Sequence, residues 1–334
     1  KANAYGHGLE QAASALTEAD LFGVTDVYEA VALEQAATGK PILVLQGMMQ
    51  TDDLHLVAEH NFQLVIHSSE QLAQIDETLS RLTLKQPLTL WLKMDSGMGR
   101  LGLSPHGFAR TYKALLGRPY TDKVVMMTHL AHSSQPDASL NLKQLNAFRA
   151  IEAELADDIH ATSIPASSGI LSDLSVDSTW ARPGIMLYGS SPFDYSHEGL
   201  RREDFDLKAV MTLRARIIAI KDMHKGDNVG YSSQYICLQD MRVGIVSIGY
   251  ADGYPSNAPN DTPVMVKGIK TATLGRVSMD MLAVNLSDIP DANVGDLATL
   301  WGQELSLDEV AAKTGILSYN LTCSIAQRVN FEYR

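Results

Sequence analysis

The chain has 334 residues, of which 39 are acidic and 27 are basic, so its formal net charge is -12. This balance argues against binding to nucleic acids or anionic membranes, because both need clustered lysine and arginine. The two cysteines, Cys237 and Cys323, form no CxxC pair, and no apolar run reaches the roughly 18 residues that a membrane-spanning helix needs. We expect a soluble cytoplasmic protein of two domains, without a zinc site or a disulfide scaffold.

In the first half of the chain, short apolar segments alternate with segments whose apolar residues recur at helical spacing. Strands that are apolar nearly throughout are typical of parallel sheets, and their alternation with helices indicates βα units. We predict strands at Leu21–Thr25, Ile42–Gln46, Phe62–Ile66, Leu88–Met94, Val124–His129, Ala161–Ala166 and Gly184–Tyr188, and helices that include Val27–Ala37, Ser69–Leu82 and Leu140–Ala156. With an eighth strand ending at Lys1, this pattern predicts a (β/α)8 barrel of the TIM type, whose first strand is missing before Lys1.

After Pro192 the segments become short, rich in β-branched residues and separated by turn signals. This pattern favours a mainly antiparallel β domain. A capping-box pattern begins at Ser306 and Gly315 provides a stop, so we predict one helix between them. The predicted strands are Leu207–Ile220, Val243–Ile248, Pro263–Val266, Thr271–Leu274, Leu282–Leu286 and Ala298–Trp301. We therefore assign residues 1–205 to a barrel domain and residues 206–334 to a β-rich C-terminal domain.

The opening segment Lys-Ala-Asn-Ala-Tyr-Gly-His-Gly is the most informative one. A lysine at the mouth of a barrel strand can form a Schiff base with an aldehyde, as in aldolases and pyridoxal-phosphate enzymes. The small residues Ala2, Ala4 and Gly6 leave space for a flat ring beside Lys1. A lone lysine is usually a surface group, so this interpretation depends on the whole octapeptide.

The glycines between Lys93 and Leu103 match the GxGxxG pattern of dinucleotide sites. That pattern belongs to the opening strand of a βαβ unit, with an acidic residue about 20 positions later, whereas this segment follows a later strand. We favour a different interpretation, in which the glycines bend the loop so that Arg100 points into the barrel mouth. There its guanidinium can bind a carboxylate through two parallel hydrogen bonds.

Further polar residues follow strands whose carboxyl ends form the active face of a barrel. His129 has a second histidine three residues later, but no carboxylate or cysteine motif accompanies them, so we assign His129 to the site and predict no metal. Ser167-Ser168-Gly169 follows the strand Ala161–Ala166, and the segment 182–185 begins the last strand. Barrels commonly bind phosphate near their last two strands, through backbone N–H groups. In the second domain, Tyr231 and Tyr250 lie beside glycines, and a phenol can act as an acid or a base.

Five segments in order, namely the opening octapeptide, DSGMGRLG, ARPGIMLYG, IGYADGYP and LGRVSMDM, resemble the alanine racemases. These are fold-type III pyridoxal-phosphate enzymes of bacterial cell-wall metabolism, and the resemblance covers nearly the whole chain. It implies a homodimeric isomerase with a shared active site that interconverts L-alanine and D-alanine. The product would supply D-alanine for peptidoglycan, or the reaction would serve catabolic racemisation.

The resemblance also implies roles for individual residues. Lys1 and Tyr231 would be the two catalytic bases, with Tyr231 reaching the cofactor from the other subunit. The cofactor pyridoxal 5'-phosphate would be held by Lys1, Tyr5, His129, Ser167, Arg182, Gly184, Ile185 and Tyr319, with Arg182 at the pyridine nitrogen and His129 between Arg182 and Tyr231. Arg100 and the Met279 backbone would hold the substrate carboxylate, a carbamylated Lys93 would orient Arg100, and Tyr250 and Asp280 would line the entrance.

The chain departs from the family pattern at two positions besides the missing strand. Ala166 stands where the family usually has asparagine, and Ser232 replaces the glycine that commonly follows the catalytic tyrosine. Three other functions stay open: a broad-specificity amino-acid racemase, a non-catalytic pyridoxal-phosphate carrier and a basic-amino-acid decarboxylase. The second domain with Tyr231 argues against a carrier. Arg182 argues against a decarboxylase, because those enzymes use an acidic residue to keep the ring protonated.

Overall fold

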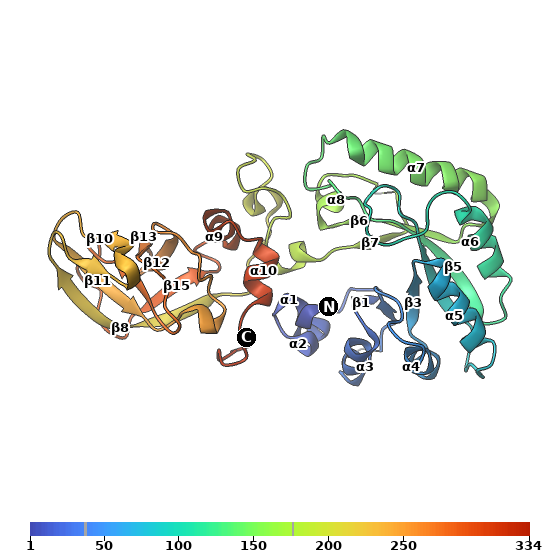
Figure 1. The fold of residues 1–334 in the computed structure, drawn as a ribbon, viewed down its shortest axis with the longest axis horizontal. Helices are drawn as coiled ribbons and strands as arrows, with labels where there is room; N and C mark the ends of the chain where they lie inside the picture. Colours follow the sequence, from blue (N-terminus) through green and yellow to red (C-terminus); the bar gives the residue numbers. More distant parts are fainter. Residues whose placement is uncertain (37–38, 176) are drawn as a thin grey trace. The chain divides into compact units, whose positions relative to one another are not determined.

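A computed structural model of the protein describes residues 1–36, 39–175 and 177–334. The chain separates into two units (Figure 1). The first unit consists of Lys1–Ala4 and Gly8–Gly184, and the second consists of Tyr5–His7 and Ile185–Arg334. Each unit has its own hydrophobic core, so each is described separately.

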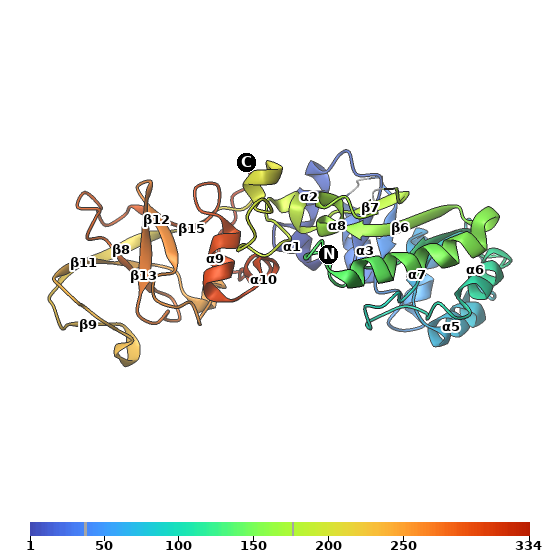
Figure 2. The same cartoon turned by 90° about the horizontal axis from the view of Figure 1, so that it is seen from above.

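The first unit contains a seven-stranded parallel sheet within the described residues, with its strands in chain order. Helices lie along the outer side of this curled sheet (Figures 1 and 2). The strands are β1 (Phe22–Val24), β2 (Ile42–Val44), β3 (Gln63–Ile66), β4 (Leu88–Lys93), β5 (Thr121–Met127), β6 (Ala161–Ala166) and β7 (Trp180–Arg182). The helices are α1 (Ala2–Tyr5), α2 (Leu9–Ala15), α3 (Val27–Gln35), α4 (Asp53–His60), α5 (Ser69–Leu79), α6 (Phe108–Leu116), α7 (Ser139–Leu155) and α8 (Ser167–Leu171), with a 3-10 turn η1 (Ala156–Asp158). The TIM-like parallel sheet is as predicted.

Alternation along the strands determines which side chains face the inside of the curled sheet. On β4, Leu90 and Leu92 belong to the core that the strands share with the helices. Trp91 belongs to a separate cluster formed by the opposite faces of the strands. Lys93 follows Trp91 by two positions and therefore faces the same inner side, where it is buried.

The prediction of a strand at Gly184–Tyr188 is wrong. The seventh strand is Trp180–Arg182, and Ile185–Tyr188 forms a 3-10 helix, η2. Pro183 explains the difference, because it lacks the N–H group that a sheet ladder needs and its ring fixes φ. Of the predicted helix Val27–Ala37, the structure contains Val27–Gln35, and Ala37 lies outside the described residues.

The second unit contains a closed antiparallel barrel in the order β11-β14-β13-β12-β15-β8. Its strands are β8 (Leu213–Met223), β11 (Met241–Val246), β12 (Pro263–Val266), β13 (Ile269–Leu274), β14 (Leu282–Asn285) and β15 (Leu297–Trp301), and β9 (Asn228–Val229) pairs separately with β10 (Tyr235–Ile236). The mainly β second domain is thus as predicted. The predicted start at Leu207 is wrong, because β8 begins at Leu213 and residues 202–205 form a 3-10 turn, η3 (Arg202–Phe205).

Two helices complete the second unit. The predicted helix is α9 (Leu307–Thr314), where the Ser306 hydroxyl accepts the Asp308 N–H at 3.2 Å and Gly315 ends the helix in the left-handed conformation. A second helix, α10 (Ser318–Cys323), was not predicted. Two further 3-10 turns are η4 (Tyr231–Ser233) and η5 (Tyr250–Asp252). In the part of the chain that the structure describes, no helix is both long and apolar enough to span a membrane.

Two adjacent serines at the start of α5 allow a direct test of its cap. The Ser68 hydroxyl accepts the Gln71 N–H at 3.1 Å, whereas Ser69 is exposed in the first turn. Ser68→Ala should lower the free energy of unfolding by about 1 kcal/mol, because a helix N–H loses its partner. Ser69→Ala is the matched control and should change stability by less than about 0.5 kcal/mol. Equal effects in denaturant titrations of the two variants would contradict the assignment of Ser68 as the cap.

Candidate active site

The backbone directly after Lys1 has an unusual conformation. Ala2, Asn3, Ala4 and Tyr5 have φ values of 51°, 49°, 53° and 54°, so α1 is a left-handed turn built without glycine. Each L-residue in this conformation costs about 1–2 kcal/mol, and such strain clusters at functional sites. Asn3 stabilises the turn, because its side-chain oxygen accepts the Leu9 N–H at 2.8 Å and its carbonyl accepts the Gly8 N–H at 3.1 Å.

Gly6, at the end of this turn, has no room for a side chain. A Cβ at this position would lie 2.1 Å from the Thr322 carbonyl oxygen. Within the second unit, the backbone of residues 5–7 is therefore in close contact with the end of α10. This contact explains why the opening motif contains glycine here, which the sequence analysis attributed only to space for a ring.

Lys93 lies in the interior of the first unit, at the end of β4. Sheet register aligns Lys93 with Met127 and Met127 with Ser163, so these three residues form one row across β4, β5 and β6. Burial, together with the positive charges of Arg100 and Arg182, lowers the pKa of the Lys93 amine to about 8. At pH 7 about a tenth of such an amine is neutral and nucleophilic.

The loop between Lys93 and Arg100 is folded around Asp95. The Asp95 carboxylate accepts backbone N–H groups from Gly97, Met98 and Gly99 at 3.0, 2.8 and 3.1 Å. The glycine-rich segment therefore encloses one of its own carboxylates. This arrangement supports the prediction that the glycines shape a loop, and it leaves Arg100 exposed at the end of that loop.

Arg182 is the most extensively hydrogen-bonded side chain of the site. Its Nη2 donates to the carbonyl oxygens of Thr128 and Ile164 at 2.7 and 2.9 Å, and its Nη1 donates to the Ser163 hydroxyl. Burial lowers the pKa of its guanidinium to about 10. This value is still well above neutral pH, so the side chain stays charged. A guanidinium has five N–H donors. Among the described residues, no contact engages the Nε proton or the second Nη1 proton, so two donors are available to a ligand.

His129 is held next to Arg182 in a single protonation state. Burial, together with the Arg182 and Lys93 charges, lowers the pKa of the imidazole to about 3, so the ring is neutral. Its Nδ1 lies 3.4 Å from Arg182 Nη2. Because arginine can only donate, Nδ1 must accept and the ring proton resides on Nε2.

Ser167 and Gly184, both predicted to bind phosphate, lie together. The Ser167 hydroxyl accepts the Gly184 N–H at 2.8 Å. Ser167 is the first residue of α8, and Gly184 follows β7 and Pro183. The Gly184 N–H is thus already bonded to Ser167. A ligand anion at this point would share or replace that bond.

In the second unit, three tyrosines form a group that the sequence analysis recognised only in part. The Tyr5 ring lies 5.1 Å from that of Tyr188 and 5.9 Å from that of Tyr319, and His7 stacks on Tyr188 at 4.4 Å. Burial raises the pKa of Tyr5 and of Tyr188 to about 12 and raises that of Tyr319 as well. All three phenols therefore stay protonated and can donate hydrogen bonds. Tyr188 was missed, although it belongs to the ARPGIMLYG motif.

Four further predicted residues lie at the surface of the second unit: Tyr231, Tyr250, Met279 and Asp280. The Tyr250 N–H donates to the Ser278 carbonyl at 3.1 Å, which holds the η5 turn against the segment carrying Met279 and Asp280. Tyr231, in the separate η4 turn, is 64% exposed and Met279 is 54% exposed. Ile185 is buried at the start of η2.

Comparison with known proteins identifies the family of the chain. The sequence profile of the alanine racemase N-terminal domain matches residues 1–192, and that of the C-terminal domain matches residues 210–333. The chain belongs to the alanine racemase family. It is 41% identical over 334 residues to an alanine racemase of Pseudomonas taetrolens and to a catabolic alanine racemase of Pseudomonas putida, covering 100% of this chain and 90% of each relative.

Solved structures of this family also have the same fold. The biosynthetic alanine racemase of Pseudomonas aeruginosa superposes with a TM-score of 0.92 at 38% identity, covering 100% of this chain and 90% of that one. An alanine racemase of Acinetobacter baumannii gives a TM-score of 0.91 at 34% identity, covering 98% of this chain and 89% of that one.

The lowered pKa of Lys93 predicts that it reacts with carbon dioxide. A neutral amine attacks CO2 and releases a proton, and the resulting carbamate would be stabilised by the surrounding positive charges. In 13C-labelled bicarbonate, the wild-type protein should give a carbamate NMR signal that increases as the pH rises towards 8 at fixed dissolved CO2. Lys93→Ala should abolish this signal. Lys113→Ala, which removes an exposed lysine paired with Asp158, is the matched control and should retain it.

Proposed function

We propose that the chain interconverts L-alanine and D-alanine with pyridoxal phosphate as its cofactor. Family membership supports this proposal, and the observation that carries it is the Lys1 motif with its left-handed turn, in the same unit as the Arg182–His129 pair. The same motifs assign residues 1–205 to the cofactor-binding barrel and residues 206–334 to the C-terminal domain. We also propose that the protein acts in the cytoplasm. The relatives include one described as catabolic and one described as biosynthetic, and both roles remain compatible with the chain.

The side chains suit this cofactor by their donor chemistry. Arg182 has free N–H donors for an unprotonated pyridine nitrogen, and the protonated phenols of Tyr5 and Tyr319 suit a phosphate. We propose that Ser167, Gly184 and Ile185 complete the phosphate contacts. When bound through Lys1, pyridoxal phosphate supplies an electron sink for charge that develops at the substrate Cα.

Racemisation requires proton removal on one face of the substrate Cα and proton delivery on the other. We propose Lys1 and Tyr231 as the two groups, because an amine and a phenol can each accept and return a proton. His129, which is neutral and donates from Nε2, would link Arg182 to Tyr231. The positive charge of Arg182 at the pyridine nitrogen would keep that nitrogen unprotonated, which weakens the electron sink and suppresses transamination.

The substrate carboxylate would be bound by Arg100. Its guanidinium is exposed at the end of the loop folded around Asp95 and can form two parallel hydrogen bonds to a carboxylate. A carbamate on Lys93 would orient Arg100, and the Met279 backbone would add a further contact. Tyr250 and Asp280 would control entry, and the ion pair of Asp280 with Arg328 at 2.6 Å would hold that part of the surface in place.

A homodimer would bring the two bases together. The exposure of Tyr231 and Met279 in a single chain is unusual for functional residues and supports completion of the site by a second copy. In a closed two-fold dimer, each C-terminal domain would cover the barrel of the partner. Each active site would then combine Lys1 of one subunit with Tyr231 of the other.

The two-base assignment predicts an asymmetric defect in Tyr231→Phe. In this family the tyrosine removes the α-proton of L-alanine and the lysine removes that of D-alanine. Exchange of the L-alanine α-proton with deuterium should therefore fall about 10²- to 10⁴-fold, together with net racemisation. Exchange from D-alanine should be much less affected. Proton NMR of each pure enantiomer measures both rates, and Tyr235→Phe, in the nearby strand β10, is the matched control. Equal losses from both enantiomers would count against this mechanism.

The shared site predicts complementation between two inactive variants. Lys1→Ala and Tyr231→Phe proteins should each have almost no activity, whereas a mixture after subunit exchange contains heterodimers with one intact site. If half of the dimers are mixed, activity should recover to about a quarter of the wild-type value. Native mass spectrometry verifies exchange. A mixture that exchanges fully and stays inactive would exclude a site built from two subunits.

A further inference from the structure

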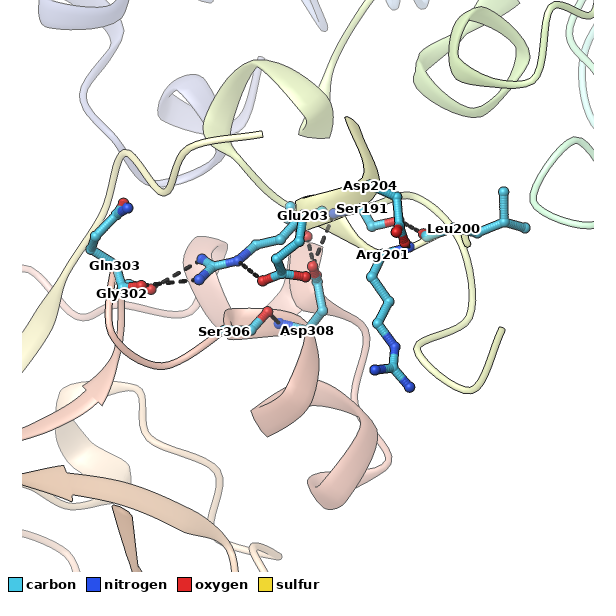
Figure 3. Close-up of polar contacts among 11 residues, drawn as sticks. Ser191, Leu200, Arg201, Glu203, Asp204, Gly302, Gln303, Ser306 and Asp308 are labelled. Carbon is cyan, nitrogen blue, oxygen red and sulfur yellow. Dashed lines mark hydrogen bonds and ion pairs between the residues drawn. The ribbon is translucent and has the colours of Figure 1, made fainter. Parts of the chain in front are cut away.

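A buried polar cluster in the second unit lies around Asp308, in the first turn of α9. Figure 3 shows Asp308 with Ser191 on one side and Ser306 on the other. The residues of this cluster are at most 9% exposed and come from three separate parts of the chain: Ser190, Ser191, Arg202, Ser306, Asp308 and Ser318. Burying a polar group without a hydrogen-bond partner costs free energy of folding. The hydrogen bonds of this cluster therefore constrain the backbone segments that carry it.

Asp308 accepts hydrogen bonds through both carboxylate oxygens. Oδ2 accepts the Ser191 N–H at 2.9 Å, and Oδ1 accepts the Ser190 hydroxyl. Burial raises the pKa of the Asp308 carboxyl, whereas the hydrogen bonds from Ser190 and Ser191 and the nearby Arg202 guanidinium oppose this rise by favouring the ionised form. Arg202 is itself fixed by the carbonyl oxygens of Gly302 and Gln303 at 3.1 and 3.0 Å (Figure 3).

The network continues from Asp308 to α10 through two hydroxyls. The Ser190 and Ser318 oxygens are 2.9 Å apart. The Ser190 hydroxyl has one proton and can donate it to Asp308 or to Ser318. Because Ser318 also hydrogen-bonds Asp308, the carboxylate and the two hydroxyls form one connected buried network.

Each end of this network adjoins a tyrosine of the group around Tyr5. Ser318 directly precedes Tyr319, and only Gly189 separates Ser190 from Tyr188. A Cβ on Gly189 would lie 1.9 Å from the Lys208 carbonyl oxygen, so the backbone of Gly189 packs directly against that of Lys208. Displacing Ser190 or Ser318 would thus move the rings that pack on Tyr5 at 5.1 and 5.9 Å.

We propose that Asp308 is a positioning residue that holds the group of Tyr5, Tyr188 and Tyr319 in place for binding the cofactor phosphate. It acts through Ser190 and Ser318, and it does not touch the ligand itself. This inference rests on the proposed function, because it presumes that Tyr5 and Tyr319 bind phosphate. Asp308 lies in α9, outside the candidate site and in a different helix from Tyr5 and Tyr319.

The experiment compares two aldehydes that differ only in the phosphate. Apo protein is titrated with pyridoxal phosphate and with pyridoxal. The dissociation constant for pyridoxal divided by that for pyridoxal phosphate measures how much the phosphate group contributes to binding. Asp308→Asn has nearly the same shape, but its amide can accept through only one oxygen. We expect this ratio to fall at least about tenfold, which is the cost of one charge-assisted hydrogen bond. Pyridoxal affinity should stay within about twofold.

Two further measurements separate positioning from general damage. Glu309→Gln makes the same chemical change one residue later, where the side chain pairs with Lys270 at the surface, and it should leave the ratio unchanged. The 31P NMR signal of the bound cofactor should shift in Asp308→Asn and not in Glu309→Gln. In a Tyr319→Phe background, Asp308→Asn should have a much smaller effect on the ratio, because the group through which it acts is already lost.

The outcomes are distinguishable from failure of the proposed function. If the wild-type protein binds neither aldehyde, the cofactor assignment itself is wrong. If the wild type prefers pyridoxal phosphate and Asp308→Asn keeps that preference, Asp308 has no positioning role. A parallel loss of both affinities would also reject it. Should Asp308→Asn fail to fold, Ser318→Ala removes only the link to α10 and should lower the ratio by itself; an unchanged ratio in that variant rejects the proposal.

Discussion

The site depends on a permanent positive charge held inside the first unit. A buried charge without partners costs several kcal/mol. Arg182 avoids that cost because the carbonyl oxygens of Thr128 and Ile164 and the hydroxyl of Ser163 accept its protons. These oxygens come from the ends of two neighbouring parallel strands, so the sheet itself provides the binding site for the guanidinium.

The neighbouring ionisable groups respond to this charge. His129 cannot take a proton next to Arg182, so it stays neutral with its proton on Nε2, and the pKa of Lys93 falls to about 8. Both shifts arise mainly from burial, and the nearby cations add to them. Arg182 thus determines the tautomer of His129, and it adds to the burial and the Arg100 charge that make Lys93 nucleophilic. These are the properties that proton transfer and carbamate formation require.

The tyrosines of the second unit divide according to their burial. Tyr5, Tyr188 and Tyr319 are largely buried with raised pKa values, which suits hydrogen-bond donors to an anion. Tyr231 has to lose its proton if it acts as a base, and in a single chain it is mostly exposed. Its environment in the proposed dimer therefore has to come from another subunit. In the proposed mechanism the same residue type would serve two opposite roles, and its surroundings would decide which one.

The sequence by itself determined the parallel and antiparallel halves, the α9 cap at Ser306 and the residues of the candidate site, because hydrophobic period, turn chemistry and local motifs are encoded in neighbouring positions. It failed at Gly184–Tyr188, where Pro183 ends the strand, and it did not identify Tyr188, α10 or the buried polar cluster around Asp308. Only the tertiary structure decided which side of β4 buries Lys93, which carbonyls hold Arg182 and which hydroxyls connect Asp308 to Tyr319. These contacts join segments far apart in the chain, and their energies depend on burial, which no local pattern specifies.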